Sequence, residues 1–218
     1  MLYTHADNSQ TNANSMRHAE LSDANALAEF LVEQFWESEQ FDFLTEGLAD
    51  PKGTLEKLAA SDLYISITKG DVYIHGEKSI TGIIAGVPAK EYSILNLLIN
   101  STNTRKIIRE VPRHDLNLVL NKMKLQKKIH NRTWFKKYSK NCYYISQVAV
   151  SKQSRGSGIF RKMITPVIED CERKNMDIVL ETFTKFNVQM YEHFGFELVE
   201  THASDELPFS DYCMIKKV

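Results

Sequence analysis

The sequence predicts a mixed α/β domain, because its last third alternates between strand-like and helix-like hydrophobic patterns. Of its 218 residues, 43% are hydrophobic and 25% are charged. These values are ordinary for a globular protein and exclude collagen-like, coiled-coil and disordered chains. A chain of this length can bury a large core without disulfides or a metal. Because no repeat or low-complexity linker divides it, we expect one domain over residues 16–218 behind a flexible polar tail over residues 1–15.

The front of the chain predicts two helices. Apolar residues recur at helical spacing over residues 27–35, and Ser22 or Asp23 before them suits a helix N-cap. A second helix is expected after Pro51, running through Leu58.

An antiparallel meander is expected next. Residues 63–68 alternate between apolar and other side chains like a strand, with the apolar ones on one face. Residues 80–87 are a mainly apolar run that predicts a second strand. A turn near residues 70–76 would join the two.

Residues 89–141 are predicted to be a basic helical segment. The formal net charge of -1 is a cancellation, because residues 1–88 carry 5 Lys and Arg against 14 Asp and Glu, whereas residues 100–140 carry 12 against 2. A solvated helical face is one interpretation of the basic run, and attraction of an anionic ligand or an acidic partner is another. Trp134 and Phe135 lie among basic residues, but without a recognised motif we expect no nucleic-acid partner.

The three cysteines, Cys142, Cys171 and Cys213, are an odd number without metal-ligand spacing. We therefore expect reduced thiols, no metal and a cytoplasmic protein, with a catalytic thiolate as the less favoured alternative.

Residues 1–15 are polar, so no secretory signal is expected. Since no apolar stretch approaches the roughly 20 residues of a membrane span, we expect no membrane partner. A monomer or a homodimer is expected.

The most informative stretch predicts a strand, a Gly-rich turn and a helix N-terminus. Residues 143–150 are strand-like and end in V-A-V, and Arg155, Gly156, Ser157 and Gly158 then open a helix with an apolar stripe. Closely spaced glycines let backbone N–H groups point into one concavity, and the positive end of the helix dipole favours an anion such as a pyrophosphate. Neither the dinucleotide-binding fingerprint nor the P-loop lysine pattern is present. The alternative is a helix start that needs only a tight turn.

A second motif follows the strand that we expect over residues 177–182. Residues 187–196 read N-V-Q-M-Y-E-H-F-G-F. Asn187 and Tyr191 are four apart and share one face of a short helix, which Gly195 ends as a C-cap.

Together these motifs resemble the GCN5-related N-acetyltransferase (GNAT) superfamily. Its usual pattern is a strand ending in V-x-V, then Arg or Gln, two residues, Gly, one residue and Gly or Ala, and later N-x-x-x-Y-E-x-x-G-F. Here V-A-V is residues 148–150 and the Arg position is Arg155. The resemblance is densest over residues 143–218.

The resemblance extends to a branch and implies a fold and an activity. L-E-T at residues 180–182, Pro166, and C-M-x-x-K at residues 213–217 look like the branch that contains puromycin N-acetyltransferase. The implied GNAT fold is a mixed, mostly antiparallel central sheet, splayed between its fourth and fifth strands and flanked by helices, with a helical segment between its third and fourth strands. The implied activity is transfer of an acetyl group from acetyl-CoA to a primary amine, most simply a small cationic molecule.

The resemblance also implies roles for individual residues. The backbone of Val148, Ala149 and Val150 would pair with the pantetheine amides, and Asn187 would contact the cofactor arm. The pyrophosphate would bind the loop formed by Arg155, Gly156, Ser157, Gly158, Ile159 and Phe160. Tyr191 would be the general acid that protonates the departing thiolate, since a phenol stays protonated at neutral pH.

Two positions depart from the superfamily pattern. Phe160 stands where the pattern has its last small residue, and we expect its ring to turn into the core. Ser146 and Gln147 stand where many relatives carry Glu or Asp on the fourth strand. Glu181 is the nearest plausible carboxylate for a general base, and water-mediated deprotonation is the alternative.

The junction of the first two helices usually borders the acceptor pocket in this superfamily. Here it reads F-W-E-S-E-Q-F-D-F, and Phe35, Trp36 and Glu37 are the expected contacts of a cationic amine. A solvated acidic loop with a few core aromatics is the alternative. We expect His130 and His193 to be solvated or capping residues.

Two other functions stay open. Phe160 and the missing strand carboxylate are compatible with a catalytically weak CoA-binding sensor or interaction module. A protein lysine or N-terminus as the acceptor is the third possibility. The front half of the chain builds the acceptor pocket and matches no pattern, so the sequence does not identify the amine.

Overall fold

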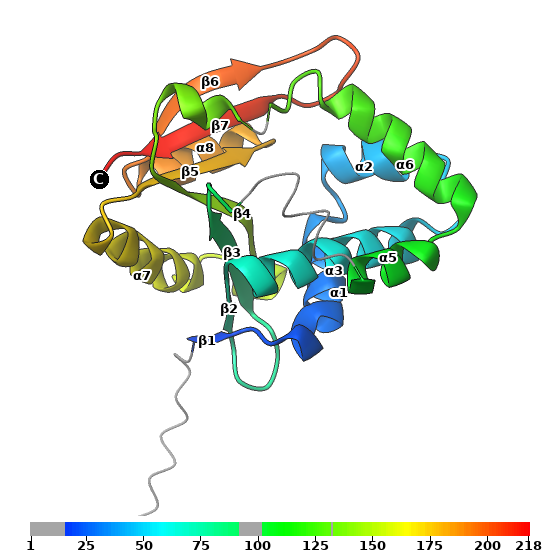
Figure 1. The fold of residues 1–218 in the computed structure, drawn as a ribbon, viewed down its shortest axis with the longest axis horizontal. Coiled ribbons are helices and arrows are strands. Elements are labelled where there is room, and N and C mark those ends of the chain that lie inside the picture. The colour runs from blue at the N-terminus through cyan, green and yellow to red at the C-terminus, as the bar shows by residue number, and fades with distance from the viewer. Residues whose placement is uncertain (1–15, 92–101, 132) are drawn as a thin grey trace, which may run out of the picture.

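Seven strands form one mixed sheet in the structure, a computed structural model that describes residues 16–91, 102–131 and 133–218 (Figure 1). The strands are β1 (Met16–His18), β2 (Asp71–His75), β3 (Gly82–Pro88), β4 (Cys142–Val150), β5 (Asp177–Thr182), β6 (Glu197–His202) and β7 (Asp211–Lys216). Their order is β1-β2-β3-β4-β5-β7-β6, and every neighbouring pair is antiparallel except β4 and β5. The predicted mixed, mostly antiparallel sheet is confirmed. The expected tail over residues 1–15 lies outside the described part of the chain.

The fourth and fifth strands part in the middle of the sheet. Their last pair is Ile145 with Leu180. Beyond it, β4 continues against β3 after a bulge at Ser146, while β5 continues against β7. Because the hydrogen-bonding groups of a strand point to both of its sides, residues 147–150 keep one edge without a strand partner among the described residues.

Helices cover both faces of the sheet. One face carries α7 (Ile159–Arg173) and α8 (Lys185–Glu192), and the other carries α1 (Ala24–Phe35), α3 (Pro51–Lys69) and the 3-10 helix η2 (Trp134–Lys137). Side chains alternate along β5, so Ile178 and Leu180 pack against α7 and α8, whereas Val179 packs with η2. Neighbouring residues of β5 are therefore packed into two separate hydrophobic cores, one on each face of the sheet.

The predicted front helices are confirmed. The first, α1, begins directly after Asp23, and α3 begins at Pro51, where Asp50 caps it by accepting a hydrogen bond from the Gly53 backbone N–H at 3.1 Å. A further short helix, α2 (Glu39–Thr45), forms within the aromatic junction and is capped by Ser38. The 3-10 turn η1 (Leu21–Asp23) precedes α1.

The strand predicted over residues 63–68 was wrong, because these residues belong to α3. This helix contacts both α1 and α5 (Thr102–Arg109), so apolar side chains occupy more than one of its sides and imitate a two-residue alternation. The first strand of the meander is instead β2, where a turn was expected. The second strand, predicted over residues 80–87, is confirmed as β3.

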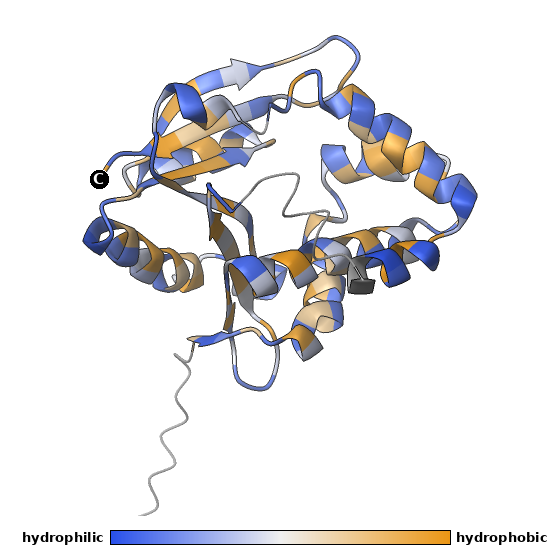
Figure 2. Ribbon diagram, viewed as in Figure 1, coloured by the Kyte–Doolittle hydropathy of each residue, from blue (hydrophilic) through white to orange (hydrophobic). Residues whose placement is uncertain are grey.

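The described part of the basic segment consists of helices joined by turns and loops, so the prediction of a helical segment is confirmed in part. It contains α5, α6 (Arg113–Gln126) and η2, while residues 92–101 and 132 lie outside the description. Figure 2 shows that α5 is largely hydrophilic and that the central strands are largely hydrophobic. Within the described ranges, no helix is long and apolar enough to cross a membrane.

One buried carboxylate fastens the basic segment to the front helices. Asp115 near the start of α6 is fully buried and accepts hydrogen bonds from the backbone N–H groups of Ala49 and Asp50, both at 2.9 Å, and from Thr54 Oγ1 at 3.2 Å. Farther along α6, Lys122 Nζ donates to the backbone carbonyl oxygen of Phe43 at 2.6 Å. These contacts fix α6 against α2 and the start of α3.

We expect Asp115→Asn to lower the thermal midpoint of unfolding by about 5 °C or more at pH 7, because an amide cannot accept all three hydrogen bonds with equal strength. The two backbone donors lower the pKa of Asp115. Its contribution is therefore complete above the ordinary carboxyl range and is lost as the pH falls through the lowered pKa. Calorimetry at several pH values measures this, with exposed Asp205→Asn as the control. An equal loss at acidic pH would contradict this account.

Candidate active site

A Gly-rich loop joins β4 to α7. Gly156 and Gly158 have φ of +80° and +82°, in the left-handed region that glycine adopts at little cost. A Cβ atom built on either glycine would meet nothing within 4 Å. Backbone conformation therefore requires the glycines, and the space in front of them is open.

The start of α7 offers hydrogen-bond donors to that open space. Gly158 is the N-cap and no side chain caps the helix, so the first-turn N–H groups have no partners within the helix. Ser157 Oγ donates to the Ser154 carbonyl oxygen at 2.6 Å, which holds the loop closed behind the glycines. Exposed Arg155, directly before Gly156, adds positive charge beside the loop. A positive helix end with free donors and a cationic neighbour suits a pyrophosphate.

Phe160 turns away from this loop, as we expected. Its ring lies in edge contact with Tyr191, with centroids 5.6 Å apart, and with Phe194 at 5.0 Å. It packs against the core cluster under α7 and α8. Only its backbone therefore faces the anion site, and the large side chain leaves the concavity open.

The free edge of β4 begins close to this loop. Ala149 is buried against α1 and the first strands, whereas Val148 and Val150 pack toward α7. Their side chains are thus fixed by both cores, and the backbone edge that β5 leaves is the part able to pair with an extended ligand.

Tyr191 and Asn187 stand on α8 at the end of β5. Tyr191 is buried, and its ring packs against those of Phe160 and Phe196, each with a centroid 5.6 Å away. Burial raises the pKa of its hydroxyl, so it stays protonated at neutral pH. Asn187 Nδ2 donates to Thr182 Oγ1 at 3.0 Å, which ties α8 to the end of β5.

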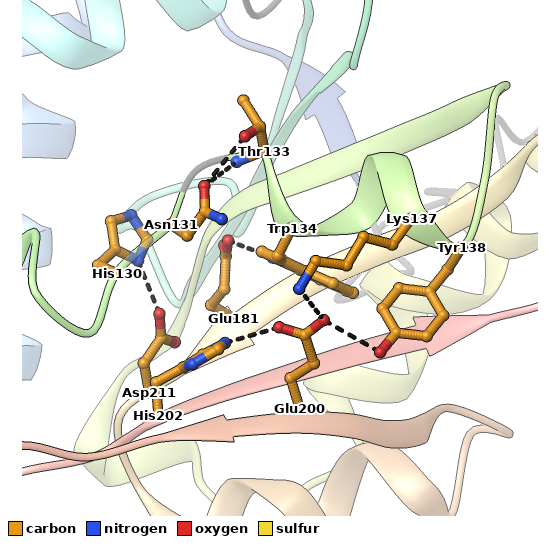
Figure 3. A network of polar contacts seen from close by, with 10 residues as sticks. All are labelled: His130, Asn131, Thr133, Trp134, Lys137, Tyr138, Glu181, Glu200, His202 and Asp211. Atoms are coloured by element: carbon orange, nitrogen blue, oxygen red, sulfur yellow. Dashed lines mark hydrogen bonds and ion pairs between the residues drawn. The ribbon is translucent and has the colours of Figure 1, made fainter.

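Glu181 lies on the opposite face of β5 from Tyr191 and contacts Trp134. Figure 3 shows Glu181 beside Trp134. Trp134 Nε1 donates to its Oε1 at 2.6 Å, and Tyr144 Oη donates to its Oε2. Burial raises the pKa of this carboxyl, although both hydrogen bonds oppose the rise. Since each oxygen already has a donor, the geometry does not favour our prediction of Glu181 as a direct general base.

The structure does not join the predicted acceptor residues to Glu181. Glu37 forms an ion pair with Lys152 at 2.8 Å, beside the Gly-rich loop, and the Lys152 backbone N–H donates to Gln34 Oε1 at 2.8 Å. Lys152 and, more weakly, Arg155 lower the pKa of Glu37. Glu37 therefore has a cation already, at the end of the site where the phosphate loop lies.

The two aromatic residues that were predicted to contact the acceptor differ in their exposure. Phe35 is half-buried, with its ring centroid 5.9 Å from that of Phe41, whereas Trp36 is 41% exposed. Trp36 is the one that has a free surface to offer a ligand.

Sequence reasoning missed a contact between a histidine and a buried carboxylic side chain near Glu181. His130 Nδ1 lies 2.9 Å from Asp211 Oδ2, and Asp211 is fully buried (Figure 3). His130 was expected to be solvated or capping, but its side chain is only 15% exposed and lies over the Phe183 ring. No sequence spacing could reveal this pair, because the two residues are 81 positions apart. His193, by contrast, is exposed beside Arg161, as expected.

Part of the basic segment is used within the fold. Lys137 Nζ lies 2.9 Å from Glu200 Oε1, which also accepts from Tyr138 Oη at 3.0 Å (Figure 3). Lys128 forms an ion pair with Glu206. These contacts fasten η2 and the end of α6 to β6 and the loop after it. They do not identify an external partner for the segment.

The cysteines are free and buried. Burial raises the pKa of Cys142 to about 11 and that of Cys171 to about 12, and it also raises the pKa of Cys213. Buried thiols of this kind form little thiolate near neutral pH, which disfavours a catalytic cysteine.

The chain is similar to known proteins in this region. Residues 128–199 match the acetyltransferase (GNAT) domain family. An uncharacterized N-acetyltransferase of Schizosaccharomyces pombe is 39% identical over 54 residues, which are 25% of this chain and 22% of that protein. The similarity thus spans about a fifth of that relative's length.

Solved structures share the whole fold. A Corynebacterium glutamicum protein described as histone acetyltransferase HPA2 and related acetyltransferase has a TM-score of 0.63 at 18% identity, over 93% of this chain and 95% of that chain. The Drosophila melanogaster polyamine N-acetyltransferase, described as catalysing the formation of N-acetylagmatine, has a TM-score of 0.53 at 12% identity, over 94% and 99%. At these identities the likeness shows the fold alone, and the resemblance to the puromycin branch stays a prediction.

We expect Trp134→Phe to lower the free energy of unfolding by about 2 to 4 kcal/mol, because it removes a donor from the buried Glu181 carboxyl and leaves unfilled volume in the core. Urea denaturation followed by circular dichroism measures the change. Trp36→Phe is the matched control at the exposed tryptophan and should change stability by less than about 1 kcal/mol. Similar losses in both variants would mean that the Glu181 contact contributes nothing.

Proposed function

We propose that this chain, whose residues 128–199 match the acetyltransferase (GNAT) domain family, transfers the acetyl group of acetyl-CoA directly to a primary amine, most simply a small cationic one. The observation that carries this proposal is the parting of β4 and β5 between the Gly-rich loop and Tyr191. It supplies an unpaired strand edge, an anion site and a buried phenol at one place in the fold.

We propose that the cofactor lies along β4 in this opening. The backbone of Val148, Ala149 and Val150 pairs with the pantetheine amides, as an added strand would. The pyrophosphate is held by backbone N–H groups and by charge from the loop that contains Arg155, Gly156, Ser157, Gly158, Ile159 and Phe160. Asn187, through its bond to Thr182, orients the start of α8 toward the cofactor arm.

In this proposal Tyr191 donates the proton that the departing thiolate takes. Its raised pKa keeps the proton on the hydroxyl until a strong base forms beside it. The hydroxyl makes no hydrogen bond to any described residue, which leaves it available to a ligand atom. The rings of Phe160 and Phe196 both pack against its ring.

For the acceptor we propose a small amine with a cationic or apolar body. Trp36 contributes an exposed ring face, with Phe35 packed behind it, and aromatic faces attract cations. Glu37 acts through its ion pair with Lys152 rather than as a free carboxylate. The polyamine and agmatine acetyltransferases among the solved structures of similar fold give this substrate class some support.

One observation favours a different function, that of a CoA-binding module with little turnover. Both oxygens of Glu181 already accept hydrogen bonds, and β4 carries Ser146 and Gln147 where many relatives have a carboxylate. Thiol release on mixing the protein with acetyl-CoA and a panel of small amines separates the two functions. Turnover with at least one amine supports the enzyme. Binding of acetyl-CoA without turnover of small amines or of protein extracts favours the module.

We expect Tyr191→Phe to lower kcat by about tenfold or more, with little change in the Kd for acetyl-CoA, because the thiolate loses its proton donor while the ring packing stays. Stopped-flow or steady-state thiol release gives kcat, and calorimetric titration gives Kd. Tyr64→Phe in α3 is the matched control. An unchanged kcat in Tyr191→Phe would remove Tyr191 from the mechanism.

We expect Gly156→Glu to weaken acetyl-CoA binding by about 100-fold or more, because it puts a carboxylate into the open space in front of the anion site. Gly156→Ala is the matched control, since it carries the same backbone strain at positive φ without the charge. It should bind much more tightly than the Glu variant. If the two variants bind equally well, the phosphate site lies elsewhere.

A further inference from the structure

A histidine and a buried carboxylate form a dyad on the side of β5 away from Tyr191. His130 follows α6, and Asp211 opens β7. Their atoms Nδ1 and Oδ2 are 2.9 Å apart, and Asp211 is fully buried. A buried carboxylate needs a charge or a donor in reach, and among the described residues His130 is the group that supplies it.

The dyad has defined neighbours (Figure 3). The His130 ring lies over Phe183, with centroids 5.8 Å apart, and the adjacent Ile129 is buried among Leu207 and Phe209. Among the residues that the structure describes, the titratable groups that face His130 from the packed elements are Asp211 on β7 and Glu181 on β5. His202 on β6 pairs opposite Asp211 in the sheet, and its own partner is Glu200.

The hydrogen bond selects which nitrogen of His130 can act as a base. With Asp211 accepting at Nδ1, the proton of the neutral ring sits on Nδ1 and the lone pair sits on Nε2. Nε2 makes no hydrogen bond to any described residue, and the side chain is 15% exposed. His130 is thus a base with one fixed end and one available end.

The two faces of β5 carry different candidate proton-transfer groups, Tyr191 on one face and His130 on the other. Thr182 and Leu180 face α8, where Tyr191 stands, and Glu181 faces the side of His130. Gln147, just past the bulge of β4, has a buried Oε1 without a hydrogen-bond partner among the described residues. Its pairing with Ala85, which packs against α1 and α3, puts it on the His130 side of the sheet. Polar groups able to receive an amine therefore collect on the face opposite Tyr191.

We propose that His130 Nε2 accepts the proton of the acceptor amine, and that Asp211 is the positioning residue that fixes its tautomer. This inference rests on the proposed acetyl transfer. The amine nitrogen forms a bond to the acetyl carbonyl carbon and the carbon–sulfur bond of acetyl-CoA breaks. The nitrogen gives its proton to His130, and the departing thiolate takes one from Tyr191.

The test compares His130→Gln with wild type over a range of pH, using an amine that wild-type protein acetylates. We expect kcat/KM at pH 7 to fall about 100-fold while the Kd for acetyl-CoA is unchanged. In wild type the rate falls toward acidic pH, because the imidazolium cannot accept a proton, and we expect this acidic limb to be lost in the variant. His114→Gln, an exposed histidine on α6, is the matched control and should retain the wild-type rate and profile.

A second variant tests Asp211 without removing the base. Asp211→Asn keeps the size of the side chain but removes the negative charge that supports the imidazolium, so we expect a lower kcat/KM and an acidic limb at lower pH.

In folded wild-type protein, imidazole ¹⁵N spectra should show the neutral His130 ring protonated on Nδ1. The Nε2-protonated tautomer would overturn the proposal, whether or not any variant folds.

Failure of this inference and failure of the proposed function give different results. If wild type acetylates an amine and His130→Gln keeps both its rate and its acidic limb, His130 is not the base and the acetyltransferase assignment stands. If wild type binds acetyl-CoA but acetylates no amine, the proposed function fails and the role of His130 fails with it.

Discussion

The structure depends on one interruption in its hydrogen bonding, the parting of β4 from β5 after Ile145 and Leu180. Each strand compensates on its other side, β4 against β3 and β5 against β7, so the sheet tolerates a gap at its centre. Two cores, one on each face, pack against both strands over the stretch where they still pair. The Gly-rich loop, Tyr191 and Glu181 are all positioned by this parting, because they lie on or just after the two strands that separate.

The basic segment between β3 and β4 frames one side of this opening. Some of its charged residues hold it to the rest of the fold: Asp115 anchors it to the start of α3, Lys122 to the carbonyl end of α2, and Lys137 to β6. The same segment ends by delivering His130 to Asp211. A run that looks like a polyelectrolyte surface in the sequence is thus in good part a scaffold that brings a remote histidine to the sheet.

Local chemistry was predictable from the sequence and long-range pairing was not. The Gly-rich turn, the helix behind it and the inward Phe160 followed from spacing and from a shared motif within one short stretch. Residues 63–68 were wrongly predicted as a strand because a helix packed on more than one side loses its simple period. The His130 and Glu37 contacts join residues far apart in the chain, so only the folded topology reveals them.

The alternation along β5 makes this short strand intolerant of changes in length. Leu180 and Thr182 serve the α8 face, and Glu181 between them serves the opposite one. Inserting or deleting a single residue before Leu180 would exchange the two sets of side chains. A carboxyl would then meet the apolar packing under α8, and Trp134 and Tyr144 would face a hydrocarbon. A change in the length of a loop at either end of β5 leaves this alternation in place, whereas a change of one residue within the strand reverses it.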